Sequence, residues 1–148
     1  MLNSLQMALC DTQGQLFELA AERGYASEAF VKVYMTSAVA ADMDKEFHHI
    51  QWAGKAYILS RMEDELSDQL VKGGEIYDKE ALYWMGYIYR YWHFYTGESS
   101  REIYKQAPAK TMNVVYLMYH TMSPEMAIDR LRESYSIDDK TAGEMHND

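Results

Sequence analysis

The sequence has a single cysteine, Cys10, and only two prolines, Pro108 and Pro124, among its 148 residues. One cysteine excludes an internal disulfide framework and every zinc site built from several cysteines. This cysteine usage is typical of a reducing compartment, so we expect a cytoplasmic protein. The chain shows neither the pattern of a signal peptide nor an apolar run of about 18 residues, so we expect no membrane-spanning segment.

Sequence motifs of catalysis are also missing. The chain has no glycine-rich phosphate loop, no nucleophile elbow and no zinc-peptidase motif. Helical ribonucleases of the HEPN type carry an Arg and a His that are four to six residues apart on one helix, whereas only two residues separate Arg90 from His93. Asp44 and His48 share a helical spacing, but two ligands do not make a metal site. We therefore expect no catalytic residue, no metal and no cofactor, and predict that the protein is not an enzyme.

Basic residues are outnumbered by acidic ones, and the net charge is −9. An acidic protein repels the phosphate backbone of nucleic acids, so general affinity for DNA or RNA is disfavoured. The charge is compatible with a basic protein partner, and solubility alone explains it equally well.

Apolar residues recur at helical spacing through most of the chain. The pattern predicts an all-α fold, which is a single-domain bundle of six to eight helices over residues 1–137 followed by a flexible acidic tail, 138–148. The expected helices cover residues 5–22, 28–35, 38–43, 55–71, 78–95, 99–107, 109–121 and 124–135.

The segment 78–95 is aromatic on almost every side. A helix that is apolar nearly all round belongs in the middle of a bundle, and Gly86 allows a second helix to approach it closely. A strand is the alternative because Tyr and Trp favour sheets, but the unbroken length argues against it. The candidate core residues are Trp84, Ile88, Tyr91 and Trp92 on this helix and Leu117 on a later one.

The order and lengths of the helices 78–95, 99–107 and 109–121 resemble a helix-turn-helix in the C-terminal half. Recognition helices need side chains that reach phosphates and base edges. The candidate nucleic-acid contacts are Arg101, Lys105, Lys110, Thr111 and Asn113. The remainder of the third helix, 114–119, is apolar and is expected to be buried, which favours a packing role for this unit over DNA contact.

Tyrosine and methionine are abundant, with 13 and 11 residues. Some of them fill the core, but the aromatic residues exceed what one helix can hide. Tyr is enriched where proteins meet, because it joins a large apolar body to a polar tip. The composition therefore favours a face that binds another protein or a second copy of the chain.

Three segments carry a resemblance to a known family: Leu16–Tyr25, Glu28–Met35 and Met85–Lys105. They resemble a family of small, uncharacterised helical proteins from Firmicutes and other gut bacteria, over most of residues 5–135. Members of that family are encoded beside small toxins, some similar to ADP-ribosyltransferases. The resemblance implies an antitoxin-like role and transfers no active-site residue.

We therefore expect a non-enzymatic protein-binding module, in its sharper form an antitoxin that covers the surface of a partner toxin. Acidic residues would steer the association. The alternatives are a DNA-binding regulator of the helix-turn-helix type and an inhibitor, encoded by a mobile element or phage, of a defence protein.

Overall fold

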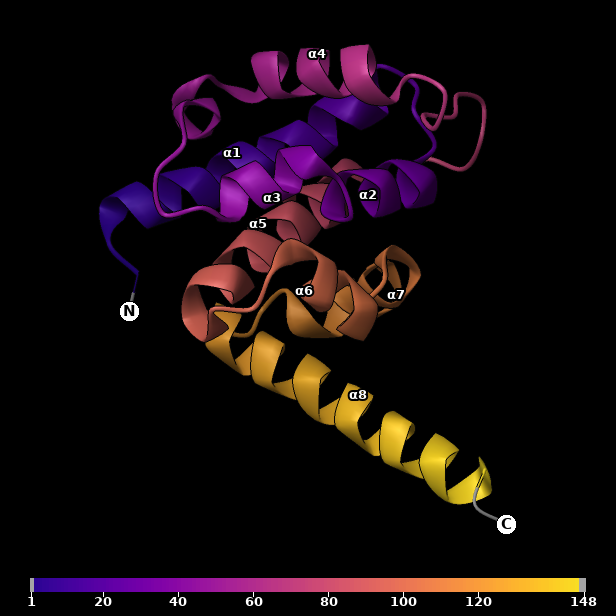
Figure 1. Ribbon diagram of the computed structural model, residues 1–148. Helices are drawn as coiled ribbons and strands as arrows, with labels where there is room; N and C mark the ends of the chain where they lie inside the picture. Colours follow the sequence, from indigo (N-terminus) through magenta and orange to yellow (C-terminus); the bar gives the residue numbers. More distant parts are fainter. Residues whose placement is uncertain (1, 147–148) are drawn as a thin grey trace.

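The chain folds as a bundle of α-helices, and the computed structural model describes residues 2–146 (Figure 1). Eight α-helices and one short 3-10 helix form the described part, which contains no β-strand. The prediction of an all-α single domain of six to eight α-helices is confirmed. The elements in chain order are α1 (Ser4–Glu22), α2 (Ser27–Met35), α3 (Ala38–Asp44), η1 (His49–Trp52), α4 (Lys55–Leu66), α5 (Lys79–Thr96), α6 (Ser100–Gln106), α7 (Ala109–Tyr119) and α8 (Pro124–His146).

Helix α5 runs through the middle of the bundle, with α1 to α4 on one side and α6 to α8 on the other (Figure 1). It buries residues on most of its circumference, among them Met85, Tyr89 and Trp92. Gly97 ends the helix in the left-handed conformation, with φ 80°, which a glycine adopts without strain. The central position predicted for the aromatic segment agrees with this arrangement.

Helices α1 and α5 make the most extensive helix pair, and two glycines lie where they approach most closely. A Cβ atom added to Gly86 would lie 2.5 Å from the carbonyl oxygen of Gln13, and one added to Gly14 would lie 2.7 Å from the ring of Tyr83. Neither site has room for a side chain. The close approach predicted from Gly86 is therefore present, and α1 is the helix that makes it.

The helix-turn-helix order is present in α5, α6 and α7. Ser99 and Glu102 form the predicted capping box, in which the Ser99 hydroxyl accepts from the Glu102 amide and the Glu102 carboxylate accepts from the Ser99 amide. Only Ala107 and Pro108 separate α6 from α7. Helix α6 packs on α2, α3 and α5, and α7 packs on α2 and α5.

Helix α8 is longer than its sequence pattern suggests. It was expected to end near Tyr135, but it continues to His146 and projects from the body (Figure 1). Within 124–140, the part of α8 whose burial is described, the buried apolar residues are Ala127, Ile128 and Leu131, all near its start. The predicted end was wrong because apolar periodicity marks only the part of a helix that packs. Residues 138–146 of the predicted tail are thus helical, residues 147–148 lie outside the described residues, and flexibility of the tail stays a prediction.

The core candidates occupy three kinds of environment. Ile88, Tyr91 and Trp92 are buried, and Trp84 is half-buried against the core. Leu117 is 77% exposed, so its assignment to the core was wrong. Helix α7 uses the side that carries Met112 to pack on the bundle, and Leu117 lies on the opposite, solvent-facing side.

Candidate functional site

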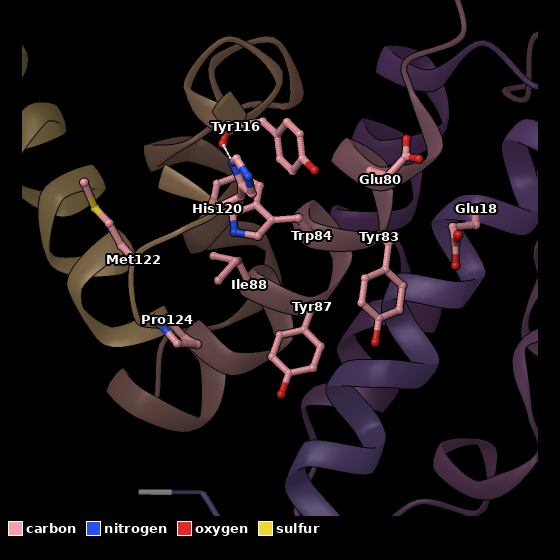
Figure 2. A pocket seen from close by; sticks show the side chains of 10 residues that line it. All are labelled: Glu18, Glu80, Tyr83, Trp84, Tyr87, Ile88, Tyr116, His120, Met122 and Pro124. Atoms are coloured by element: carbon pink, nitrogen blue, oxygen red, sulfur yellow. Dashed lines mark hydrogen bonds between the residues drawn. The ribbon is translucent and has the colours of Figure 1, made fainter. Parts of the chain in front are cut away.

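A groove runs along one exposed stripe of α5 (Figure 2). Its volume is about 560 Å³. Helix α1 flanks the stripe on one side, and the end of α7 with the following turn flanks it on the other. Neither covers the stripe, which therefore stays partly open to solvent. We call this site the α5 groove, and its lining residues are Glu18, Glu80, Tyr83, Trp84, Tyr87, Ile88, Tyr116, His120, Met122 and Pro124.

Aromatic rings belong to five of the ten residues that line the α5 groove. Trp84 meets Tyr116 edge-on, with ring centroids 5.7 Å apart, and Tyr116 stacks on His120 at 4.6 Å. Tyr83 and Tyr87 stand next to one another on α5 at 6.1 Å (Figure 2). The spacing of Tyr83, Trp84 and Tyr87 by three and four residues places all three on one side of the helix.

Two carboxylates, Glu18 from α1 and Glu80 from α5, line the groove together with these rings. Partial burial raises the pKa of Glu18, and Lys55 and Lys79 oppose that rise. Lys79 is itself bonded to Glu22, at 2.7 Å. The groove therefore combines π-faces with negative charge, and neither of these lysines is among its lining residues.

A ladder of tyrosines, Tyr83, Tyr87, Tyr91 and Tyr95, runs along α5 from the groove. The hydroxyls of all but Tyr87 bond to acidic side chains of other helices. Tyr83 donates to Asp11 of α1, and Tyr91 donates to Glu125 of α8. Burial and these hydrogen bonds raise the pKa of both tyrosines. Tyr95 donates to Asp129 at 3.1 Å. The ladder thus ties α1 and α8 to the central helix.

A second feature of α5 is a buried ion pair between Arg90 and Asp44. The Arg90 side chain has no exposed surface, and its Nη1 lies 2.6 Å from Asp44 Oδ1. Gln13 accepts from Arg90 Nε at 3.0 Å, and Ser100 donates to Asp44 at 2.7 Å. These partners come from α1, α3 and α6. The cluster satisfies its own hydrogen bonds, so it joins helices and offers no unpaired group for chemistry.

His93 completes the surroundings of this cluster. Its Nδ1 lies 2.7 Å from the carbonyl oxygen of Glu98, so this nitrogen carries the proton and donates it. A pocket of about 710 Å³ opens beside it, with Asp44 and His93 on its wall and Phe47 and Trp52 at its exposed edge. The polar atoms of Asp44 are already taken by Arg90 and Ser100. Lys45, Glu46 and Gln51 also line this pocket, so it mixes apolar rings with polar groups.

The residues predicted to contact nucleic acid lie on two helices, α6 and α7. Arg101 donates to the carbonyl oxygen of Thr36, which engages its guanidinium within the fold. Lys105 is exposed on α6, Lys110 and Thr111 are exposed on the first turn of α7, and Asn113 is half-buried.

The solvent-facing side of α7 is apolar beyond its first turn. Val114 is 70% exposed, Leu117 77% and Met118 65%. These three residues recur at spacings of three and four, so they form one stripe, which we call the α7 face. The expectation that residues 114–119 are buried was wrong for this stripe. Tyr116, next to Leu117 in the chain, lines the α5 groove (Figure 2). Helix α7 thus contributes to the groove with one side and to the α7 face with another.

Metal ions and membranes are two further possible contacts of the described residues. No group of three or more His, Cys, Asp or Glu side chains that suits a metal ion occurs there. Within the same part of the chain, no helix has the length and apolar character needed to span a membrane.

No protein-family model, curated protein or solved structure matches this chain. The interpretation of the site therefore depends on its own geometry.

Proposed function

We propose that this chain is a non-enzymatic protein-binding module that acts as an antitoxin, covering the surface of a partner protein with its α7 face. The observation that carries the proposal is the exposure of Val114, Leu117 and Met118 on one stripe of a helix. Exposed apolar residues that adjoin one another are a candidate interaction surface, because water against them is released when another protein covers them. The net charge of −9 suits a basic partner and would speed the encounter.

The same stripe favours protein contact over DNA contact. A recognition helix presents polar and basic side chains to the major groove. Helix α7 presents Val114, Leu117 and Met118 there, and its only basic residue is Lys110, at its start. Burying an apolar stripe against another protein is favourable because the stripe is removed from water. The same stripe forms no hydrogen bond with base edges or phosphates.

An antitoxin of this type works by steric occlusion. Each large apolar side chain that becomes fully buried contributes about 1.5–3 kcal/mol, so three of them can anchor a complex. The proposal places the protein in the cytoplasm with its target. A defence protein blocked by a mobile-element inhibitor is the alternative target, and a second copy of this chain is the alternative occupant of the α7 face.

Co-expression with the product of the neighbouring gene tests the proposal. The unaltered chain should restore growth and co-purify with that product, and Leu117→Lys should lose both effects. The matched control is Leu5→Lys, because Leu5 is also an exposed leucine, at 63%, but lies on α1. Both variants should keep their thermal stability within about 0.5 kcal/mol, since both sites are exposed.

Two results would contradict the proposal. One is full rescue and co-purification by Leu117→Lys. The other is a dimer of the isolated chain in a sedimentation experiment, if Leu117→Lys dissociates it and Leu5→Lys does not. The α7 face would then be covered by a second copy.

A further inference from the structure

The α5 groove has the composition of a cation-binding site. Four rings, Tyr83, Trp84, Tyr87 and Tyr116, and two carboxylates, Glu18 and Glu80, line it together. The face of an aromatic ring attracts a cation that lies within about 6 Å, and the attraction grows when water is displaced. We propose that the α5 groove receives an arginine side chain from a basic segment of the partner protein, which deepens the proposed function and rests on it.

Charge complementarity identifies the occupant. Glu18 and Glu80 make the groove negative. Partial burial raises the pKa of Glu18, and a further cation in the groove would favour its charged form. Asp11, bonded to Tyr83, and Glu125, bonded to Tyr91, add negative charge beside the groove. An acidic or neutral segment would gain nothing from these groups.

Arginine suits the groove better than a compact cation does. Its planar guanidinium stacks on aromatic faces and offers a fork of donors to a carboxylate at the same time. The arrangement of rings on one side of α5 with Glu18 across from them provides both partners (Figure 2). The hydroxyl of Tyr87 is an additional acceptor, because it carries no hydrogen bond to another described residue, unlike those of Tyr83 and Tyr91.

A protein segment is the source of that arginine because helix α7 contributes both to the groove and to the α7 face. Tyr116 lines the groove and the next residue, Leu117, lies on the exposed stripe. Because successive residues of a helix lie about 100° apart, the groove and the α7 face lie on different sides of α7. A partner seated on the α7 face therefore reaches the groove with a segment that extends around this helix.

Titration of the full chain with two short peptides tests the inference without the partner. The probes are acetyl-Gly-Arg-Gly-amide and the same peptide with citrulline, which keeps the shape of arginine and removes the charge. The readout is the indole N–H resonance of Trp84, identified by its loss in Trp84→Phe. The arginine peptide should shift this resonance with a dissociation constant in roughly the millimolar range, and the citrulline peptide should bind at least about tenfold more weakly.

Variants separate the rings from the charges. Glu18→Gln combined with Glu80→Gln should weaken binding of the arginine peptide about fivefold, and Tyr87→Leu should weaken it by about threefold. Asp64→Asn is the matched control, because it removes one carboxylate from the exposed surface of α4 and should leave binding unchanged. Thermal unfolding of each variant verifies that the fold is retained.

Equal binding of the arginine and citrulline peptides would overturn the inference, because the groove would then take an uncharged segment. The absence of any shift with either peptide would overturn it as well. So would movement of the Trp84 resonance with protein concentration alone, which would assign the groove to a second copy. Each of these outcomes leaves the co-expression result for Leu117→Lys intact, so failure of the groove is distinguishable from failure of the α7 face.

Discussion

Gly86 of α5 lies directly against the backbone of Gln13 of α1, so that a Cβ at position 86 would be 2.5 Å from the Gln13 carbonyl oxygen. The neighbouring atoms are backbone and cannot rotate away. Gly86→Ala should therefore push the two helices apart and destabilise the protein by about 2–3 kcal/mol, even though alanine favours helices. Urea unfolding followed by circular dichroism measures the change.

Gly97→Ala provides the comparison for that experiment. Gly97 has φ 80° and no atom near its missing Cβ, so only backbone strain opposes alanine there. Its cost should be about 1 kcal/mol, which is smaller than that of Gly86→Ala. A larger loss of unfolding free energy for Gly97→Ala than for Gly86→Ala would contradict the close contact between α1 and α5.

The buried ion pair predicts a strongly non-additive pair of variants. Asp44→Ala leaves the fully buried Arg90 without its counter-charge and should cost about 3–5 kcal/mol. Arg90→Met combined with Asp44→Ala should cost clearly less than the sum of the two single changes, because no charge is then left unpaired. A double-mutant cycle in urea gives the coupling, and strict additivity would show that the two groups do not interact.

The Tyr91–Glu125 hydrogen bond predicts a pH-dependent contribution to stability. The bond lowers the pKa of Glu125 below its ordinary 4.5, so the stabilisation is present above pH 4.5 and is lost as the pH falls through the lower folded pKa. Tyr91→Phe should therefore cost about 1 kcal/mol at pH 7 and much less at pH 3. Urea midpoints at both pH values provide the measurement.

Tyr57→Phe is the control for this pH series. Tyr57 is 53% exposed on α4, and no side-chain hydrogen bond of its hydroxyl occurs among the described residues. The variant should match the unaltered protein at both pH values. A loss at pH 3 as large as that at pH 7 for Tyr91→Phe would show that packing, and not the carboxylate, accounts for the effect.

Cys10 should be unreactive in the folded protein. Its side chain has no exposed surface, and burial raises the pKa of its thiol to about 12. Almost no thiolate is then present at pH 8, and no reagent reaches the sulfur. Labelling with a maleimide, followed by mass spectrometry, should show no modification until denaturant is added. Rapid modification of the native protein would place Cys10 at the surface.

The sequence predicted the helices and the central helix because these follow from local patterns. The apolar periodicity located 78–95, and the Ser99 and Glu102 pair marked the start of the next helix. The cluster of Arg90 was missed because its partners Gln13 and Asp44 lie far from it along the chain. No local pattern contains such a contact.

The α7 face was missed for a different reason. Val114, Leu117 and Met118 are as apolar as core residues, and a sequence pattern does not say whether an apolar stripe is covered by the same chain. The α5 groove was likewise hidden, because a helix that is aromatic all round was expected to be fully covered. The abundance of tyrosine was the one signal for a surface of this kind, and it gave no position.

Protection of position 117 in the complex tests the central claim most directly. Because Cys10 is buried, Leu117→Cys introduces a reactive thiol on the α7 face, and Ser60→Cys provides a control on the exposed side of α4. The account predicts that a maleimide labels both variants when the chain is alone. With the co-purified partner bound, labelling at 117 should fall by at least about tenfold while labelling at 60 stays unchanged. Equal labelling of position 117 in the free and bound chain would contradict the account.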